Sequence, residues 1–195
     1  LPFGPWVDAM RGAGLVAWAQ EGPALAPGVR SELARLFPEL GTPTTGPARA
    51  DEHVRLFEAV AALLGTIAER TPLLIVLEDL HWADDLSVRL LAFLRRRLAD
   101  RPVLLLGTVR ETDLEAGHPL VRMIGIESDE RLVKIALGGL TEPETTALVQ
   151  TAARVGTASA AVGRLGGRLW RASDGNPLQI LETLHTLEDH DLAGG

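Results

Sequence analysis

The chain has 195 residues, a formal net charge of −7 and no cysteine. Its length suffices for one sizeable domain, and an apolar fraction of 46% excludes global disorder. The negative charge argues against nucleic-acid binding by the domain as a whole, and the lack of cysteine excludes disulfides and thiolate metal sites.

The sequence carries no signal for a membrane or for secretion. No apolar run approaches the ~20 residues that a membrane-spanning helix needs. The first residues lack a basic segment followed by an apolar one, so we do not expect them to form a signal peptide. We therefore expect a soluble cytoplasmic protein without membrane partners. The sequence begins without Met and runs directly into a helical pattern, which is typical of a fragment or a processed piece.

The N-terminal quarter predicts helices and a loop. Residues 5–20 have apolar residues at helical spacing, with an interruption at Gly12 and Gly14. Ser31 is placed to cap a short helix over residues 32–40. A polar loop rich in Pro and Gly follows over residues 41–50.

The next stretch predicts a helix and then a strand. Asp51 is placed to cap an amphipathic helix that reaches Arg70. The five apolar residues 73–77, entered through Pro72, predict a strand buried on both faces, as in parallel sheets.

Two acids, Glu78 and Asp79, come directly after this strand. Parallel sheets bind ligands beyond the carboxyl ends of their strands. An acid pair at that place can hold a hydrated Mg²⁺ and orient or deprotonate a water molecule. The alternative is that both acids only end the strand and solvate the turn.

A second helix and a second strand complete a βαβ unit. The helix begins near Asp84 or Asp85, and a buried apolar run over residues 103–109 follows it. This strand ends in Arg110, at the same sheet edge as the acid pair. There a guanidinium can pair with an acid or hold a γ-phosphate with two parallel hydrogen bonds.

The last third predicts one more strand and several helices. A short helix over residues 119–126 precedes an edge strand over residues 131–137. Thr141 to Glu144 form a capping box for a helix that reaches Arg154. Residues 156–167 are also compatible with a helix.

The segment Gly175-Asn176-Pro177 predicts a helix–turn–helix corner. Gly175 suits a helix C-cap, and Pro177 suits the first turn of the next helix. The five His residues show no metal-ligand spacing on one predicted face, and His81 is interpreted as a packing residue beside Trp82.

The segment Glu78-Asp-Leu-His-Trp-Ala-Asp84 after a buried strand resembles the Walker B segment of the signal-transduction ATPases with many domains, which include LuxR-type and MalT-like transcription regulators. The strand-end Arg110 and the later Gly-Asn-Pro segment match the same family in the same order. The resemblance implies ATP and Mg²⁺ as cofactors. It implies that Glu78 reaches Mg²⁺ through water, that Asp79 polarises the attacking water and that Arg110 senses the γ-phosphate. Which acid has which role stays open, because the family often has Asp at the first position.

The resemblance also implies the fold: an α/β, three-layer, P-loop NTPase-like parallel sheet, incomplete because its first strands are missing, followed by a small helical lid. The divisions would be an N-terminal helical segment and loop at 1–50, the α/β core at 51–140 and the lid at 141–195. In the lid, Gly175, Asn176 and Pro177 would pack against the base and ribose of the nucleotide.

The family's phosphate-binding loop, Gly-x-x-x-x-Gly-Lys-Ser/Thr, does not occur in the sequence, whose single Lys is Lys134. Two accounts stay open: a piece of a larger ATPase, or a natural degenerate domain. We therefore expect a partial ATP-binding switch domain of a bacterial signalling or transcriptional regulator, unable to hydrolyse ATP alone. The alternative is a non-catalytic module for protein interaction or self-association. Direct nucleic-acid binding by these residues is not expected.

Overall fold

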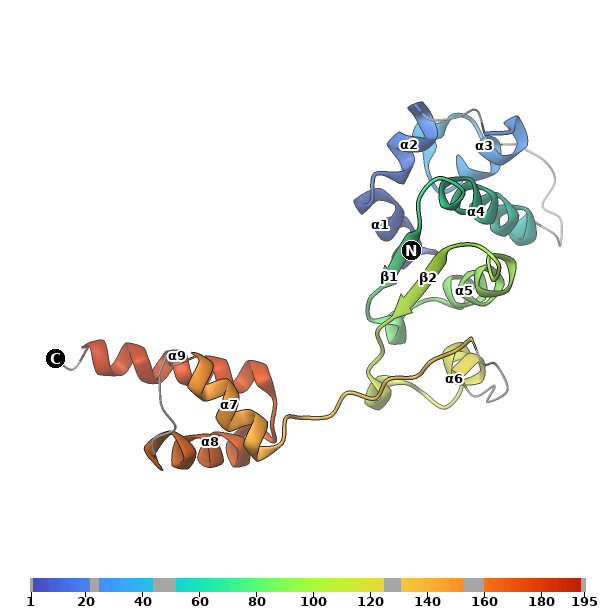
Figure 1. Cartoon of the computed structure of the whole chain (residues 1–195). Helices are drawn as coiled ribbons and strands as arrows, with labels where there is room; N and C mark the ends of the chain where they lie inside the picture. The colour runs from blue at the N-terminus through green and yellow to red at the C-terminus, as the bar shows by residue number, and fades with distance from the viewer. Residues whose placement is uncertain (1, 22–24, 44–51, 125–130, 153–159, 194–195) are drawn as a thin grey trace. The chain divides into compact units, whose positions relative to one another are not determined.

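The computed structural model describes residues 2–21, 25–43, 52–124, 131–152 and 160–193 (Figure 1). It divides into two compact units, Leu1–Leu132 and Val133–Gly195, each with its own hydrophobic core. Unit 1 contains the sheet and unit 2 consists of helices.

The N-terminal part of unit 1 is helical. Its elements are α1 (Gly4–Gly12), α2 (Leu15–Glu21), α3 (Pro27–Leu33) and the 3-10 turn η1 (Pro38–Leu40). The predicted interruption is confirmed, since α1 ends at Gly12 and Gly14 adopts a φ of 68°. The predicted helix over residues 32–40 is wrong. Pro27, with its fixed φ, starts α3 earlier than Ser31 would, and Pro38 starts a separate turn.

Two long helices of unit 1 confirm the helical patterns around the central strand. They are α4 (Glu52–Ala68) and α5 (Asp85–Arg97); the proposed cap Asp51 lies outside the described residues. Leu64 of α4 and Leu94 of α5 are fully buried in the same core as Ile75 and Leu77 of the first strand. This shared core fixes the sheet against the helices.

The sheet has two parallel strands among the described residues, β1 (Leu73–Leu77) and β2 (Val103–Gly107). Leu73 lies opposite Val103, and Leu77 lies opposite Gly107. The α/β class and the parallel βαβ unit are therefore confirmed. β2 ends two residues before the predicted end, where a Cβ on Gly107 would lie 2.6 Å from a methyl of Leu80.

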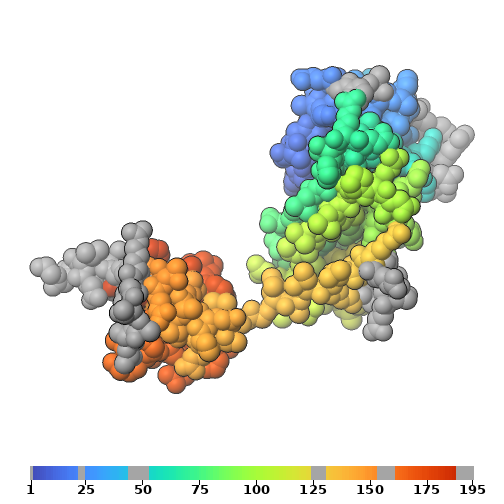
Figure 2. Space-filling view, viewed as in Figure 1, coloured from blue at the N-terminus to red at the C-terminus, as the bar shows by residue number. Residues whose placement is uncertain are grey.

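The prediction that the strands are buried on both faces is wrong. Leu74 and Leu104 are 61% and 64% exposed, and Val76 and Leu106 are 40% and 47% exposed. Successive side chains of a strand point to opposite faces, so these four residues share one face of the sheet. Figure 2 shows β1 and β2 lying open at the surface of unit 1. We call this surface the open sheet face.

The predicted edge strand over residues 131–137 is also wrong. These residues form no strand, and Val133, Ile135 and Leu137 are 77%, 76% and 92% exposed. Apolar and polar residues alternate here as they do in a strand, but a strand also needs a neighbouring strand as the partner of its backbone hydrogen bonds. Within the described ranges, only β1 and β2 pair with each other.

The remaining helices agree with their patterns. They are α6 (Pro119–Ile124), α7 (Glu142–Ala152), α8 (Ala160–Ser173) and α9 (Pro177–Ala193), whereas the 3-10 turns η2 (Leu80–Trp82) and η3 (Glu111–Asp113) were not predicted. The predicted end of α6 and the predictions for residues 153–159 lie outside the described residues. In unit 2, the three helices α7, α8 and α9 enclose a core that contains Val149, Leu169 and Ile180. No described helix is both long enough and apolar enough to cross a membrane.

Two local predictions in unit 2 are confirmed. Glu144 accepts hydrogen bonds from the backbone N–H and the hydroxyl of Thr141, at 2.8 and 2.7 Å, which is a capping box at the start of α7. Gly175 has a φ of 73° between α8 and α9, and Pro177 opens α9.

Candidate functional site

Three hydrogen bonds tie the carboxyl ends of β1 and β2 together. The Thr108 N–H donates to the carbonyl of Leu77 at 3.0 Å, and the Leu80 N–H donates to the carbonyl of Thr108 at 2.9 Å. The Asp79 N–H donates to the Thr108 hydroxyl, also at 2.9 Å. The acid pair and Arg110 therefore follow neighbouring strand ends at one end of the sheet.

Asp79 has a left-handed backbone conformation, with φ 51° and ψ 45°. For a residue other than Gly this conformation costs roughly 1–2 kcal/mol, and such strain is often found at functional sites. It reverses the chain sharply between β1 and η2. Glu78 and Asp79 are both exposed as a result.

An open cavity of about 760 Å³ lies next to the acid pair. Four carboxylates line it together with apolar residues: Asp8, Glu78, Asp79 and Asp84, with Pro2, Gly4, Pro5, Ala9, Val76 and Trp82. Trp82 is 79% exposed. A cavity with this lining attracts cations and offers an apolar wall for a flat group.

Asp84 joins α1 to the start of α5. Its carboxylate caps α5 by accepting from the Leu86 and Ser87 N–H groups, at 3.0 and 3.1 Å, and it also accepts from the Phe3 N–H at 3.0 Å. Burial alone would raise the pKa of Asp84. The Ser87 hydroxyl and the Ser87, Phe3 and Leu86 amides outweigh that effect and hold the pKa below its ordinary value.

His81 is buried directly behind the acid pair. Its Nδ1 accepts from the Arg110 N–H at 3.4 Å and lies 3.9 Å from Asp79 Oδ1. Its Nε2 lies 3.6 Å from Asp113 Oδ2 and has no hydrogen-bond partner among the residues that the structure describes. The ring also contacts Trp82 with 5.2 Å between centroids, as predicted. Its contacts with Asp79 and Arg110 do not follow from the sequence pattern, because they depend on how β2 ends.

Arg110 reaches the site through its backbone. The Arg110 side chain is exposed and is not part of the cavity lining, and it forms no ion pair with Glu78 or Asp79 in the described parts of the chain. The roles expected for these three side chains therefore remain predictions.

The Gly-Asn-Pro segment lies in unit 2 and has a local structural role there. The Leu140 N–H donates to the Gly175 carbonyl at 2.8 Å. The Asn176 side chain accepts from the Leu178 and Gln179 N–H groups, at 3.0 and 3.3 Å, and so caps α9.

The donor set at the strand ends fits a hydrated Mg²⁺, which typically takes one or two carboxylates and keeps several waters. Within the described residues, no group of three or more His, Asp or Glu side chains is arranged to hold a metal by itself. The carboxylates of Glu78 and Asp79 therefore suit an ion that is also held by phosphate oxygens.

A family model for the AAA ATPase domain matches residues 1–106. The chain belongs to the AAA ATPase domain family. The match covers β1, the acid pair and nearly all of β2, whereas Arg110 and unit 2 lie beyond it. Membership in the AAA ATPase domain family implies nucleotide binding in general. Comparisons with curated proteins and with solved structures gave no match.

Proposed function

We propose that this AAA ATPase domain is the ATP-binding switch part of a cytoplasmic bacterial signalling or transcriptional regulator of the LuxR and MalT-like type. The observation that carries the proposal is the junction of β1 and β2. Hydrogen bonds through Thr108 hold the strand ends side by side, so Glu78, Asp79 and Arg110 all start from one end of a parallel sheet.

The proposed roles follow from the chemistry of the side chains. ATP and Mg²⁺ would supply the triphosphate and the charge that neutralises it. Glu78 would hold the ion through water, and Asp79 would orient the attacking water, with its backbone fixed by Thr108. Arg110 would contact the γ-phosphate with its guanidinium fork.

His81 acts in this proposal as a positioning residue. It is buried between the acid turn and the start of η3, and it accepts a hydrogen bond from the Arg110 N–H. A buried ring at that place keeps Asp79 and the Arg110 backbone at a fixed separation.

The same proposal assigns the larger organisation of the chain. Residues 1–50 are an N-terminal helical segment and loop, residues 51–140 are the α/β core of a three-layer P-loop-like fold, and residues 141–195 are a helical lid. Gly175, Asn176 and Pro177 would pack against the base and ribose of the nucleotide.

The test is Mg·ATP binding and turnover by the intact protein. We expect Asp79→Asn to lower turnover by a factor of about 10²–10⁴, the usual contribution of a positioned acid or base, while ATP affinity changes little. Glu78→Gln should weaken the Mg²⁺ dependence and Arg110→Ala should weaken ATP binding. Glu115→Gln, an exposed acid on the loop after η3, is the matched control. Unchanged ATP affinity and turnover in all three site variants would contradict the roles assigned to Glu78, Asp79 and Arg110.

The second candidate function is a non-catalytic module for protein interaction or self-association. The open sheet face favours it, because contiguous exposed aliphatic residues mark interaction surfaces. Calorimetry with Mg·ATP and sedimentation of this chain discriminate between the two. Micromolar ATP binding contradicts the second candidate, whereas a stable dimer without ATP binding supports it.

A further inference from the structure

Helix α8 carries its positive charges along one side. Arg164, Arg168 and Arg171 are spaced four and three residues apart, which places them on one face of a helix. At 1.5 Å of rise per residue they extend over roughly 10 Å of the helix. The sequence of α8 contains no Asp or Glu. We call these three residues the arginine stripe.

The arginine stripe is not neutralised by any of the residues that the structure describes. All three side chains are exposed, and none has an ion pair or hydrogen bond with any described residue. Some arginines of unit 1 do pair with acids, as Arg89 does with Asp85 at 2.7 Å and Arg101 with Glu69 at 2.7 Å. Like charges three and four residues apart destabilise a helix, so a bound anion would relieve this repulsion.

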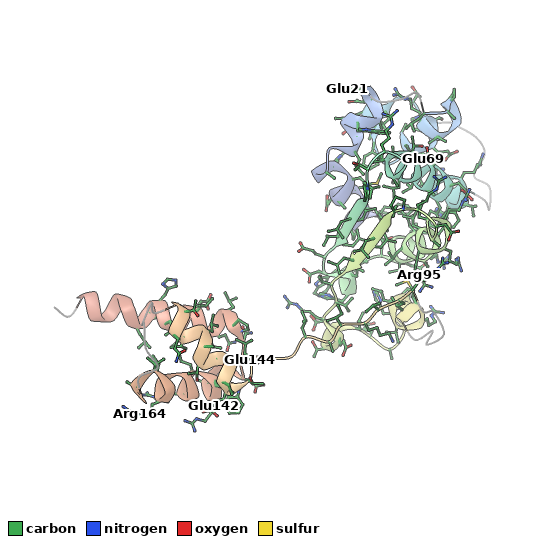
Figure 3. All side chains as sticks on the ribbon, in the orientation of Figure 1. Glu21, Glu69, Arg95, Glu142, Glu144 and Arg164 are labelled. Atoms are coloured by element: carbon green, nitrogen blue, oxygen red, sulfur yellow. The ribbon has the colours of Figure 1, made fainter. Side chains whose placement is uncertain are left out.

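The stripe borders a cavity of about 600 Å³ in unit 2. Its lining consists of the three arginines, Gly163 and Gly167 of α8, and Glu142 of α7. Figure 3 labels Arg164 and Glu142 on this unit. The cavity therefore has guanidinium groups and a single carboxylate around a floor of glycine backbone.

The two glycines that line the floor of the cavity, Gly163 and Gly167, differ in what a side chain at their positions would contact. A Cβ on Gly167 would lie 2.5 Å from Glu142 Oε1, so packing against α7 explains that glycine. A Cβ on Gly163 would meet no described atom within 4 Å. Glycine inside a helix is less stable than alanine, and contacts among the described residues do not explain it at this position. A ligand that approaches the backbone closely would explain it.

The charges around the cavity define the ligand. Three guanidinium groups and one carboxylate sum to +2 at neutral pH, which matches a single dianion. Phosphomonoesters carry a charge close to −2 and three oxygens that suit the fork of arginine. We propose that the arginine stripe, Gly163 and Glu142 form a binding site for a dianionic phosphoryl group, carried by a protein side chain or by a free phosphate compound.

This proposal does not depend on the proposed nucleotide site, because none of its residues has a role in that site. The test is calorimetry of the full chain, at constant ionic strength, with a short phosphoserine peptide, its unphosphorylated form, inorganic phosphate and succinate. Binding of either phosphate ligand at least ten times tighter than succinate and the unphosphorylated peptide supports the site. Tighter binding of the phosphopeptide assigns the source to a protein, and binding of inorganic phosphate that is equal or tighter assigns it to a free compound. No preference for phosphate overturns the proposal.

Arginine substitutions distinguish a specific phosphate-binding site from nonspecific attraction of anions to positive charge. Replacing all three arginines of the stripe with alanine should weaken phosphate binding at least tenfold. The matched control replaces Arg55, Arg70 and Arg122, three exposed arginines of unit 1 whose side chains likewise form no ion pair or hydrogen bond with a described residue, and should change binding less than twofold. Equal losses in the two triple variants would overturn the site.

Two single variants test the role of Gly163 in the floor of the cavity and the role of Glu142 as its one negative charge. Gly163→Ala should raise the melting temperature of unit 2 yet weaken phosphate binding several-fold, so that the loss cannot come from unfolding. Glu142→Gln should strengthen binding several-fold, because it removes the one negative charge. Unchanged binding in both variants would contradict the assignment of this cavity.

Discussion

Asp84→Ala should destabilise unit 1 by about 2 kcal/mol, a value that can be worked out from the contacts of the carboxylate. Loss of an N-cap side chain costs roughly 1 kcal/mol, within a range of 0.5–2. The Phe3 N–H also loses a charged acceptor, a bond worth about 1.5–3 kcal/mol when shielded, which partial exposure reduces to about 1 kcal/mol.

The pH dependence of the stability difference between the wild type and Asp84→Ala gives a second test of the role of Asp84. The folded-state pKa of Asp84 is lowered, so its stabilising effect is fully present above the unfolded-state value, for which the ordinary value of 3.8 applies. It is lost as the pH falls through the folded-state pKa. The stability difference between the wild type and Asp84→Ala should therefore be largest at neutral pH and shrink below pH 3.8.

Urea unfolding at pH 7 and at a pH below 3, followed by tryptophan fluorescence, measures both effects. A Trp170→Phe background restricts the signal to the tryptophans of unit 1. Asp85→Ala is the matched control, since Asp85 forms an exposed ion pair with Arg89 and no other ion pair with a described residue, and its loss should cost less than about 0.5 kcal/mol. Equal effects of the two substitutions at pH 7 would refute the reasoning.

Three further outcomes are expected. Gly175→Ala should destabilise unit 2 by more than about 1 kcal/mol in thermal unfolding, because φ is 73° and a Cβ would collide with the Leu140 carbonyl; an unchanged melting temperature would contradict the geometry. Leu94→Ala should cost about 2–5 kcal/mol in urea unfolding and Leu74→Ala far less, since Leu94 is fully buried and Leu74 is 61% exposed. A carboxylate titration by NMR should show the pKa of Glu144 below its ordinary value, because the N–H and then the hydroxyl of Thr141 donate to it, and Thr141→Ala should move that pKa upward.

Local signals in the sequence predicted much of the fold correctly. The capping box at Thr141 and the cap of α5 at Asp84 are determined by residues within three positions of each other. The strand Leu73–Leu77 is specified by its apolar run and by Pro72 before it. Such elements depend little on distant parts of the chain.

The misjudged features depend on partners that a sequence pattern does not contain. Whether Leu74 and Leu104 are buried depends on what covers the second face of the sheet, not on the strand itself. The alternation of Val133, Ile135 and Leu137 is that of a strand, yet pairing requires another free strand edge.

In the candidate site, too, some features follow from the sequence pattern and others depend on distant contacts. The acid pair and Arg110 could be placed at one sheet end from the order of strand, helix and strand. The left-handed backbone of Asp79 and the contacts of His81 with Asp79 and Arg110 could not, because they arise where Thr108 closes the end of β2 over η2.

The start of the chain is held by contacts across a long sequence separation. The Phe3 N–H donates to Asp84, and the indole N–H of the fully buried Trp6 donates to the Ser87 carbonyl at 3.0 Å; both pairs are 81 residues apart. Closing so long a loop costs entropy before the contacts compensate for it, and a high contact order slows folding. During synthesis α1 therefore cannot pack in its final position until the beginning of α5 has left the ribosome. Until then other hydrophobic surfaces have to cover the Trp6 side chain temporarily.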